Sequence, residues 1–186
     1  DDHVALFDTV KATHTEEMLW RIGQVIDPGR IDTIVVNHAE MDHSGSLGRL
    51  IETVHPERVF ASPACEKALK AHFHYSGWPV HVVKSGDRLN LGRRNVSFLE
   101  TKMLHWPDSM FSFLEEDGLL ISSDAFGAHY ASSERFDDEV EAGELMHQAG
   151  KYYANILNPY SPLVLGLLEQ VRNLGLRINM IAPDHG

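Results

Sequence analysis

The sequence has one cysteine, Cys65, among its 186 residues. A single cysteine excludes an internal disulfide and any zinc or iron–sulfur centre that is built from cysteines. A metal centre in this chain would therefore need histidine, aspartate and glutamate ligands. The chain contains twelve histidines, which makes such a centre worth testing.

Long apolar runs and an excess of basic charge are also missing. The longest apolar stretch, residues 162–168, is far shorter than the roughly 20 residues that span a bilayer. Sixteen basic against twenty-seven acidic side chains give a formal net charge of -11, the wrong sign for a surface that binds phosphates. The segments rich in glycine and serine lack P-loop or Rossmann spacing. We therefore expect no membrane segment and no nucleic-acid or nucleotide partner.

Length and composition predict one domain over residues 1–186. A chain of this size is close to the roughly 150 residues of one domain, and 43% hydrophobic residues are enough for a core. Strand and helix patterns alternate up to about residue 75. Short strands are expected at residues 80–84, 96–101, 111–115 and 119–122, helices at 139–157 and 161–174, and a last strand at 178–182. This order predicts a mixed α/β fold in layers.

A hexad of metal-binding residue types follows the apolar strand expected at residues 31–36. It contains His38, Glu40, Asp42 and His43. If the strand geometry continues to residue 40, His38 and Glu40 project to the same side, and the other two lie in the turn before the next helix. Such an arrangement suits two neighbouring metal ions. A solvated polar loop is the alternative, but it would have to explain four donors at once.

Three further donors stand at the ends of expected strands, namely His105, Asp124 and His185. Loops on a rigid framework are where metal-binding and catalytic groups concentrate. These residues complete a set of seven candidate ligands. We assign the remaining eight histidines, His129 among them, to surface or core positions.

Four segments together resemble the metallo-β-lactamase-like domain of the flavodiiron proteins. They are the hexad at residues 38–43 and the stretches at residues 105–110, 123–127 and 182–186. The similarity extends from Asp8 almost to the last residue. It implies an αββα sandwich with a non-haem diiron site at one edge of the β layers.

The resemblance also implies roles for single residues. One iron would be bound by His38, Glu40 and His105, and Asp124 would bridge the two ions. The second iron would be bound by Asp42, His43 and His185, although some members of the family do not use the histidine at the position of His43. Family members hold a tyrosine near the open face of the site, and Tyr152 matches it best; the alternative for Tyr152 is a core aromatic residue on a helix.

Glu40 distinguishes this sequence from the hydrolytic proteins of the same fold, which commonly carry histidine there. The carboxylate adds a negative charge and a hard oxygen donor, which suits iron or manganese and favours redox chemistry. We therefore expect a diiron oxidoreductase that reduces O2 to water, NO to N2O, or both. Two alternatives stay open: a dizinc hydrolase acting on an ester, thioester or phosphodiester, and a metal-binding domain without catalytic activity.

The resemblance further implies an electron supply from outside residues 1–186. In flavodiiron proteins a flavodoxin-like domain that binds FMN normally follows, and an extra strand hairpin precedes. We expect this chain to be a fragment that lacks both, in a cytoplasmic homodimer or larger assembly. Rubredoxin or a flavin-bearing donor would supply the electrons.

Overall fold

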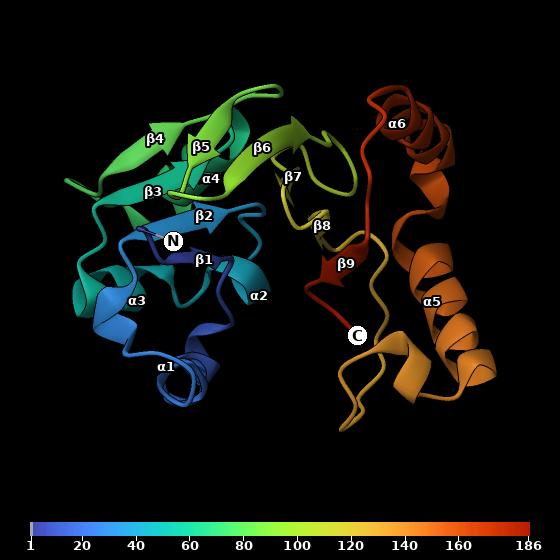
Figure 1. Ribbon diagram of the computed structural model, residues 1–186, viewed down its shortest axis with the longest axis horizontal. Helices are drawn as coiled ribbons and strands as arrows, with labels where there is room; N and C mark the ends of the chain where they lie inside the picture. The colour runs from blue at the N-terminus through green and yellow to red at the C-terminus, as the bar shows by residue number, and fades with distance from the viewer. Residues whose placement is uncertain (1) are drawn as a thin grey trace.

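Two β-sheets lie at the centre of the fold, which a computed structural model describes for residues 2–186 (Figure 1). The first sheet has the strand order β1-β2-β3-β4, and every neighbouring pair is parallel. Its strands are β1 (Ala5–Phe7), β2 (Thr33–Val36), β3 (Arg58–Ala61) and β4 (Val80–Val82). All four residues of β2 are buried, as expected for an inner strand that is covered on both faces.

Helices connect the strands of the first sheet. They are α1 (Thr15–Gly23), α2 (Met41–Ser44), α3 (Leu47–Val54) and α4 (Pro63–Phe73), with short 3-10 turns at Ala12–His14 and Pro28–Arg30. The side chain of Ser62 caps α4 by accepting a hydrogen bond from the backbone N–H of Cys65, and Pro63 stands in the first turn. Both features agree with the helix predicted to begin here.

The second sheet has the order β5-β6-β7-β8-β9 and is antiparallel except for the parallel pair β8 and β9. Its strands are β5 (Arg88–Asn90), β6 (Asn95–Glu100), β7 (Met110–Leu114), β8 (Leu119–Ser123) and β9 (Met180–Pro183). Gly118 adopts a positive φ of 64° in the hairpin turn between β7 and β8. Strand β5 was not expected from the sequence, because only Leu89 of its three residues is buried and so short a strand shows no clear alternation.

Two long helices follow the second sheet, α5 (Ala142–Ile156) and α6 (Ser161–Asn173), with 3-10 turns at Asp137–Glu139 and Asn158–Tyr160. Helix α5 begins three residues later than the predicted stretch. The carboxylate of Glu141 accepts hydrogen bonds from the backbone N–H groups of Gly143 and Glu144, and this cap sets the start of the helix.

Three hydrophobic clusters separate four layers. The first joins α1, α3 and α4 to one face of the parallel sheet, and the second fills the space between the two sheets. The third joins the other face of the second sheet to Leu167 of α6. Figure 1 accordingly shows α1 and α3 on one flank, α5 and α6 on the other, and the sheets between them. The predicted αββα sandwich is confirmed, whereas the single domain over residues 1–186 stays a prediction.

Among residues 2–186, no helix is both long enough and apolar enough to cross a membrane.

Candidate metal centre

The seven predicted ligands come together from five places in the fold. Residues 38 and 40 follow β2, and residues 42 and 43 belong to α2. Residue 105 lies between β6 and β7, and residues 124 and 185 follow β8 and β9. Their donor atoms form two groups, within each of which all atoms lie within 4.8 Å of one another. The groups are His38, Glu40, His105 and Asp124, and Asp42, His43 and His185.

Asp124 stands between the two groups and faces both. Its Oδ2 lies 3.1 Å from Nε2 of His105 and 3.4 Å from Nε2 of His38. Its Oδ1 lies 3.0 Å from Nε2 of His43 and 3.1 Å from Nε2 of His185. One carboxylate therefore offers one oxygen to each group, which is the geometry that a bridging ligand needs.

The ligands differ in exposure, and this divides the centre into two parts. We define the floor as His38, His43 and Asp124, whose side chains are 0%, 3% and 4% exposed. We define the rim as Glu40, His105, Asp42 and His185, whose side chains are 36%, 17%, 26% and 25% exposed. A small molecule from solvent would therefore reach the centre across the rim.

Asp8 fixes the backbone that carries the hexad. Its Oδ1 accepts hydrogen bonds from the backbone N–H groups of Asn37 (2.8 Å) and His38 (3.3 Å). Its Oδ2 accepts one from the side-chain amide of Asn37 at 2.9 Å. Asn37 in turn accepts a hydrogen bond from the Ser112 hydroxyl of β7, at 2.6 Å. The end of β2 is thus tied to β1 and to the second sheet, and burial raises the pKa of Asp8.

Carboxylates outside the ligand set stand behind the two imidazoles of the floor. Oδ2 of Asp108 is hydrogen-bonded to Nδ1 of His38 at 3.1 Å and accepts a bond from the backbone N–H of Ala39 at 2.7 Å. Oδ2 of Asp184 lies 3.1 Å from Nδ1 of His43, but the two groups are not aligned for a hydrogen bond. Neither aspartate was singled out from the sequence.

The ionisable groups of the floor shift one another's pKa values. Burial alone would lower the pKa of His43, but the carboxylates of Asp124 and Asp184 raise it to about 11. Burial opposes ionisation of Asp124, yet the imidazoles of His105, His185 and His43 close to its carboxylate hold its pKa well below the usual range. The pKa of His38 is raised in the same way: burial opposes the shift, and the carboxylate of Asp108 outweighs it. In the floor, imidazoles with a raised pKa therefore lie next to buried carboxylates.

The donor set fits a pair of metal ions. Oδ1 of Asp42 and Nε2 of His43 are buried and lack a hydrogen-bond partner, although both point into the cluster of donors. Buried polar atoms are rarely left unpaired, and a bound cation would satisfy both. Three carboxylates and four imidazoles are a hard and borderline donor set that suits iron, manganese or zinc.

Two aromatic side chains border the rim beside His185. Tyr152 of α5 is buried, and its ring centroid lies 6.0 Å from that of His185. The ring of His129 lies 4.8 Å from Tyr152 and 5.3 Å from His185. The structure thus brings Tyr152 to the centre, and burial followed by the charge of Asp124 raises its pKa. It also places His129 there, a residue assigned to surface or core from the sequence; it lies in an irregular segment with no motif to reveal it.

A further aromatic ring encloses the other end of the centre. The indole of Trp106 meets the ring of His38 edge-on at 5.3 Å and that of His105 at 6.3 Å. The sequence places Trp106 directly after His105, but a tryptophan next to a histidine is not a motif that predicts a role at a metal centre.

Two sheets between helical layers, with imidazole and carboxylate donors for two metal ions at the strand ends, define the metallo-β-lactamase-like class of proteins. Within this class, the family described as "ODP family beta lactamase" matches residues 1–186, and the chain belongs to this family.

Named relatives agree with this assignment. The chain is 49% identical over 186 residues to the rubredoxin-oxygen oxidoreductase of Megalodesulfovibrio gigas and 44% identical over 186 residues to the nitric oxide reductase of Moorella thermoacetica. These matches cover 100% of this chain but 46% and 47% of the relatives, so the chain spans about half of their length. The crystal structure of the flavodiiron protein from Giardia intestinalis matches with a TM-score of 0.95 and 33% identity, over 100% of this chain and 45% of that one. The resemblance to flavodiiron proteins is confirmed.

Proposed function

We propose that this chain is the diiron domain of an oxidoreductase that reduces O2 to water, NO to N2O, or both. The observation that carries the proposal is the position of Glu40. Its Oε2 lies 3.2 Å from Nε2 of His38 and 3.4 Å from Nε2 of His105. An anionic oxygen thus belongs to the donor set at the place where hydrolases of this fold commonly carry an imidazole, and a hard anionic donor favours the higher oxidation state of iron.

The ligand assignment is part of the proposal. His38, Glu40 and His105 would hold one ion, Asp42, His43 and His185 the other, and Asp124 would bridge them. Two iron ions held in this way would supply redox equivalents and Lewis acidity for the reduction of a diatomic gas.

The residues around the ions have their own tasks. The floor would keep its part of the centre shielded from solvent, and the rim would leave one side accessible to the gas. Tyr152 is buried next to His185, and because its pKa is raised it keeps its proton at neutral pH. We assign its hydroxyl the task of donating a hydrogen bond to the molecule that is being reduced.

Electrons have to come from outside this chain's centre. The name of the Megalodesulfovibrio gigas relative includes rubredoxin as well as oxygen, which supports rubredoxin or a flavin-bearing protein as the donor. FMN in a flavodoxin-like domain outside residues 1–186 would pass the electrons on. The homodimer and the cytoplasmic location stay predictions.

Gas uptake by the iron-loaded protein tests the proposal. The protein is prepared without oxygen, loaded with ferrous iron and mixed with NO or O2 in an electrode cell, with and without a reduced flavodoxin-like partner. We expect two irons per chain and, without the partner, uptake that stops when the two electrons of a diferrous pair are spent; this suffices for one reduction of two NO to N2O and for half of the four electrons that O2 needs. With an excess of the reduced partner, uptake should continue. The zinc-loaded protein is the control: without the partner it should take up neither gas, and with the partner it gives the background of O2 consumed by reduced flavin alone. A fully iron-loaded protein that consumes neither gas, while its zinc form hydrolyses esters, would instead support the dizinc hydrolase.

A further inference from the structure

Asp108 lies behind the floor on the side away from the metal positions. It is buried, in the segment between β6 and β7, and its Oδ2 makes both the bond to Nδ1 of His38 and the bond to the backbone of Ala39. Nε2 of His38 points the other way, towards Glu40 and Asp124. The imidazole is therefore held at one nitrogen and presents the other to the cluster.

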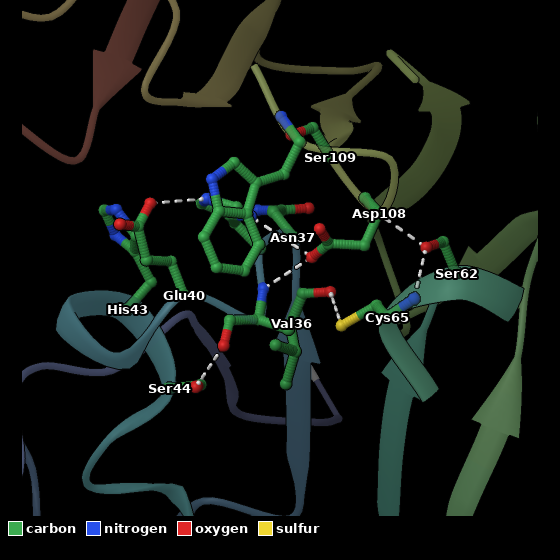
Figure 2. A network of polar contacts seen from close by, with 12 residues as sticks. Val36, Asn37, Glu40, His43, Ser44, Ser62, Cys65, Asp108 and Ser109 are labelled. Atoms are coloured by element: carbon green, nitrogen blue, oxygen red, sulfur yellow. Dashed lines mark hydrogen bonds and ion pairs between the residues drawn. The ribbon is translucent and has the colours of Figure 1, made fainter. Parts of the chain in front are cut away.

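The position of Asp108 is fixed by contacts that do not involve any ligand. Its backbone carbonyl accepts a hydrogen bond from the Ser62 hydroxyl at 2.8 Å, and the same hydroxyl caps α4 at Cys65. The thiol of Cys65 donates to the carbonyl of Val36 in β2 at 3.7 Å. Figure 2 shows this ring of contacts, with Asp108 between the end of β2 and Ser62, and Cys65 beside Val36. The backbone of Asp108 is thus anchored to the start of α4 by contacts that involve none of the seven candidate ligands.

We propose that Asp108 is the positioning residue of the first metal position: it holds the His38 imidazole with a proton on Nδ1, so that Nε2 is the nitrogen that binds metal. A neutral imidazole carries one ring proton, and a carboxylate that accepts it selects the tautomer and raises the basicity of the other nitrogen. The inference rests on the proposed ligand set but not on the redox activity.

The other three imidazoles lack this support. The contact between Asp184 and His43 is close but not aligned for a hydrogen bond. In the part of the chain that the structure describes, Nδ1 of His105 and Nδ1 of His185 have no side-chain or backbone hydrogen bond. The first metal position should therefore depend on its supporting carboxylate more than the second position does.

Cobalt titration of Asp108→Asn tests this. The metal-free protein is titrated with Co²⁺ against a competing chelator, and the two binding steps are followed by the visible absorption of the ion. A His105→Ala variant, which lacks a ligand of the first position, identifies the step that belongs there. We expect Asp108→Asn to weaken the first position by about 10-fold to 100-fold, with a shifted absorption band, and to leave the second position unchanged.

Asp8→Asn is the matched control. It also replaces a buried carboxylate by an amide at the end of β2, but Asp8 is hydrogen-bonded to the backbone and to Asn37 rather than to an imidazole. It should lower the melting temperature while the ratio of the two cobalt affinities stays that of the unmodified protein. Equal weakening of both positions by Asp108→Asn, or no weakening at all, would overturn the proposal.

A second measurement needs no variant and serves if Asp108→Asn does not fold. In the zinc-loaded protein, nitrogen-15 NMR of the histidine rings should show a hydrogen-bonded proton on Nδ1 of His38 and metal on its Nε2. Metal on Nδ1, or a proton on Nε2, contradicts the proposal. Since cobalt and zinc need no electron donor, neither result depends on whether the iron form consumes NO or O2.

Discussion

The floor and the rim of the metal centre contain similar residue types in opposite surroundings. Both parts combine histidines with carboxylates. Floor residues are nearly inaccessible, and each of their imidazoles faces an additional carboxylate, Asp108 or Asp184. Rim residues are a sixth to a third exposed. We propose on this contrast that the floor retains the metals, whereas the rim determines which metal binds and admits the substrate.

The largest effect is expected from Asp124→Asn, which breaks the floor. The substitution removes a charge that faces both metal positions and leaves buried imidazoles without their shared partner. We expect the affinity for both metals to fall by more than about 100-fold, beyond the range typical of a residue outside the ligand set. Chelator competition and metal analysis measure the loss. Retention of both metals at unchanged affinity would mean that Asp124 does not bridge.

The second largest effect is expected from pH, which should change the metal affinity of the floor. Because the pKa of His43 in the metal-free protein is about 11, this side chain carries a proton at pH 7, and a metal that binds to it must displace that proton. The affinity of the second position should therefore rise by up to about tenfold per pH unit below pH 11. Calorimetry in buffers of different ionisation enthalpy counts the protons released. For the His43→Asn variant, we expect metal binding to release one proton fewer. If the number of released protons is unchanged, His43 is not a ligand.

Glu40→His tests the rim as the part that selects the metal. Replacing the carboxylate by an imidazole removes the hard donor from the first position, so we expect the ratio of bound zinc to bound iron to rise by about tenfold, the change that about 1.4 kcal/mol produces. Elemental analysis of protein from cells that were supplied with both metals gives this ratio. The same ratio in variant and parent would assign metal choice to other residues.

The smallest effect is expected from Tyr152, which lies beside the rim residue His185. Tyr152→Phe removes one hydroxyl, and the loss of a hydrogen bond worth about 1 kcal/mol should slow gas uptake roughly fivefold at unchanged metal content. Tyr153→Phe is the control, because the Tyr153 hydroxyl pairs with Ser161, outside the donor cluster. A uniform slowing by both variants would point to damage in α5 rather than to the hydroxyl.

Much of the fold could be predicted from the sequence because its signals are local. The buried run of β2 and the capped start of α4 are both continuous in the chain. Residues 38, 40, 124 and 185 follow strands and stood out as polar residues after apolar runs, whereas Asp42 and His43 lie in the short helix α2 and His105 lies in the segment between β6 and β7. Strand β5 was missed because its three residues hold one buried side chain.

The surroundings of the ligands could not be predicted in the same way. His129 meets Tyr152 only through the tertiary packing of an irregular segment against α5. Asp108 reaches His38 across 70 positions of sequence, and Asp8 reaches Asn37 across 29. Such contacts depend on how the layers stack, and a single sequence carries no periodic signal for them.

The spread of the ligands along the chain has a consequence for biosynthesis. The first ligand follows the second strand of the chain, and the last follows β9, which pairs in parallel with β8 of the other sheet. The second metal position cannot be completed until β9 has docked, because His185 belongs to its donor group. On the proposed ligand set, a metal can therefore fill the second position only in a chain whose last strand is in place. A metal bound there would link residues 42 and 43 to residue 185, so separating these parts of the chain would cost the binding free energy of that ion.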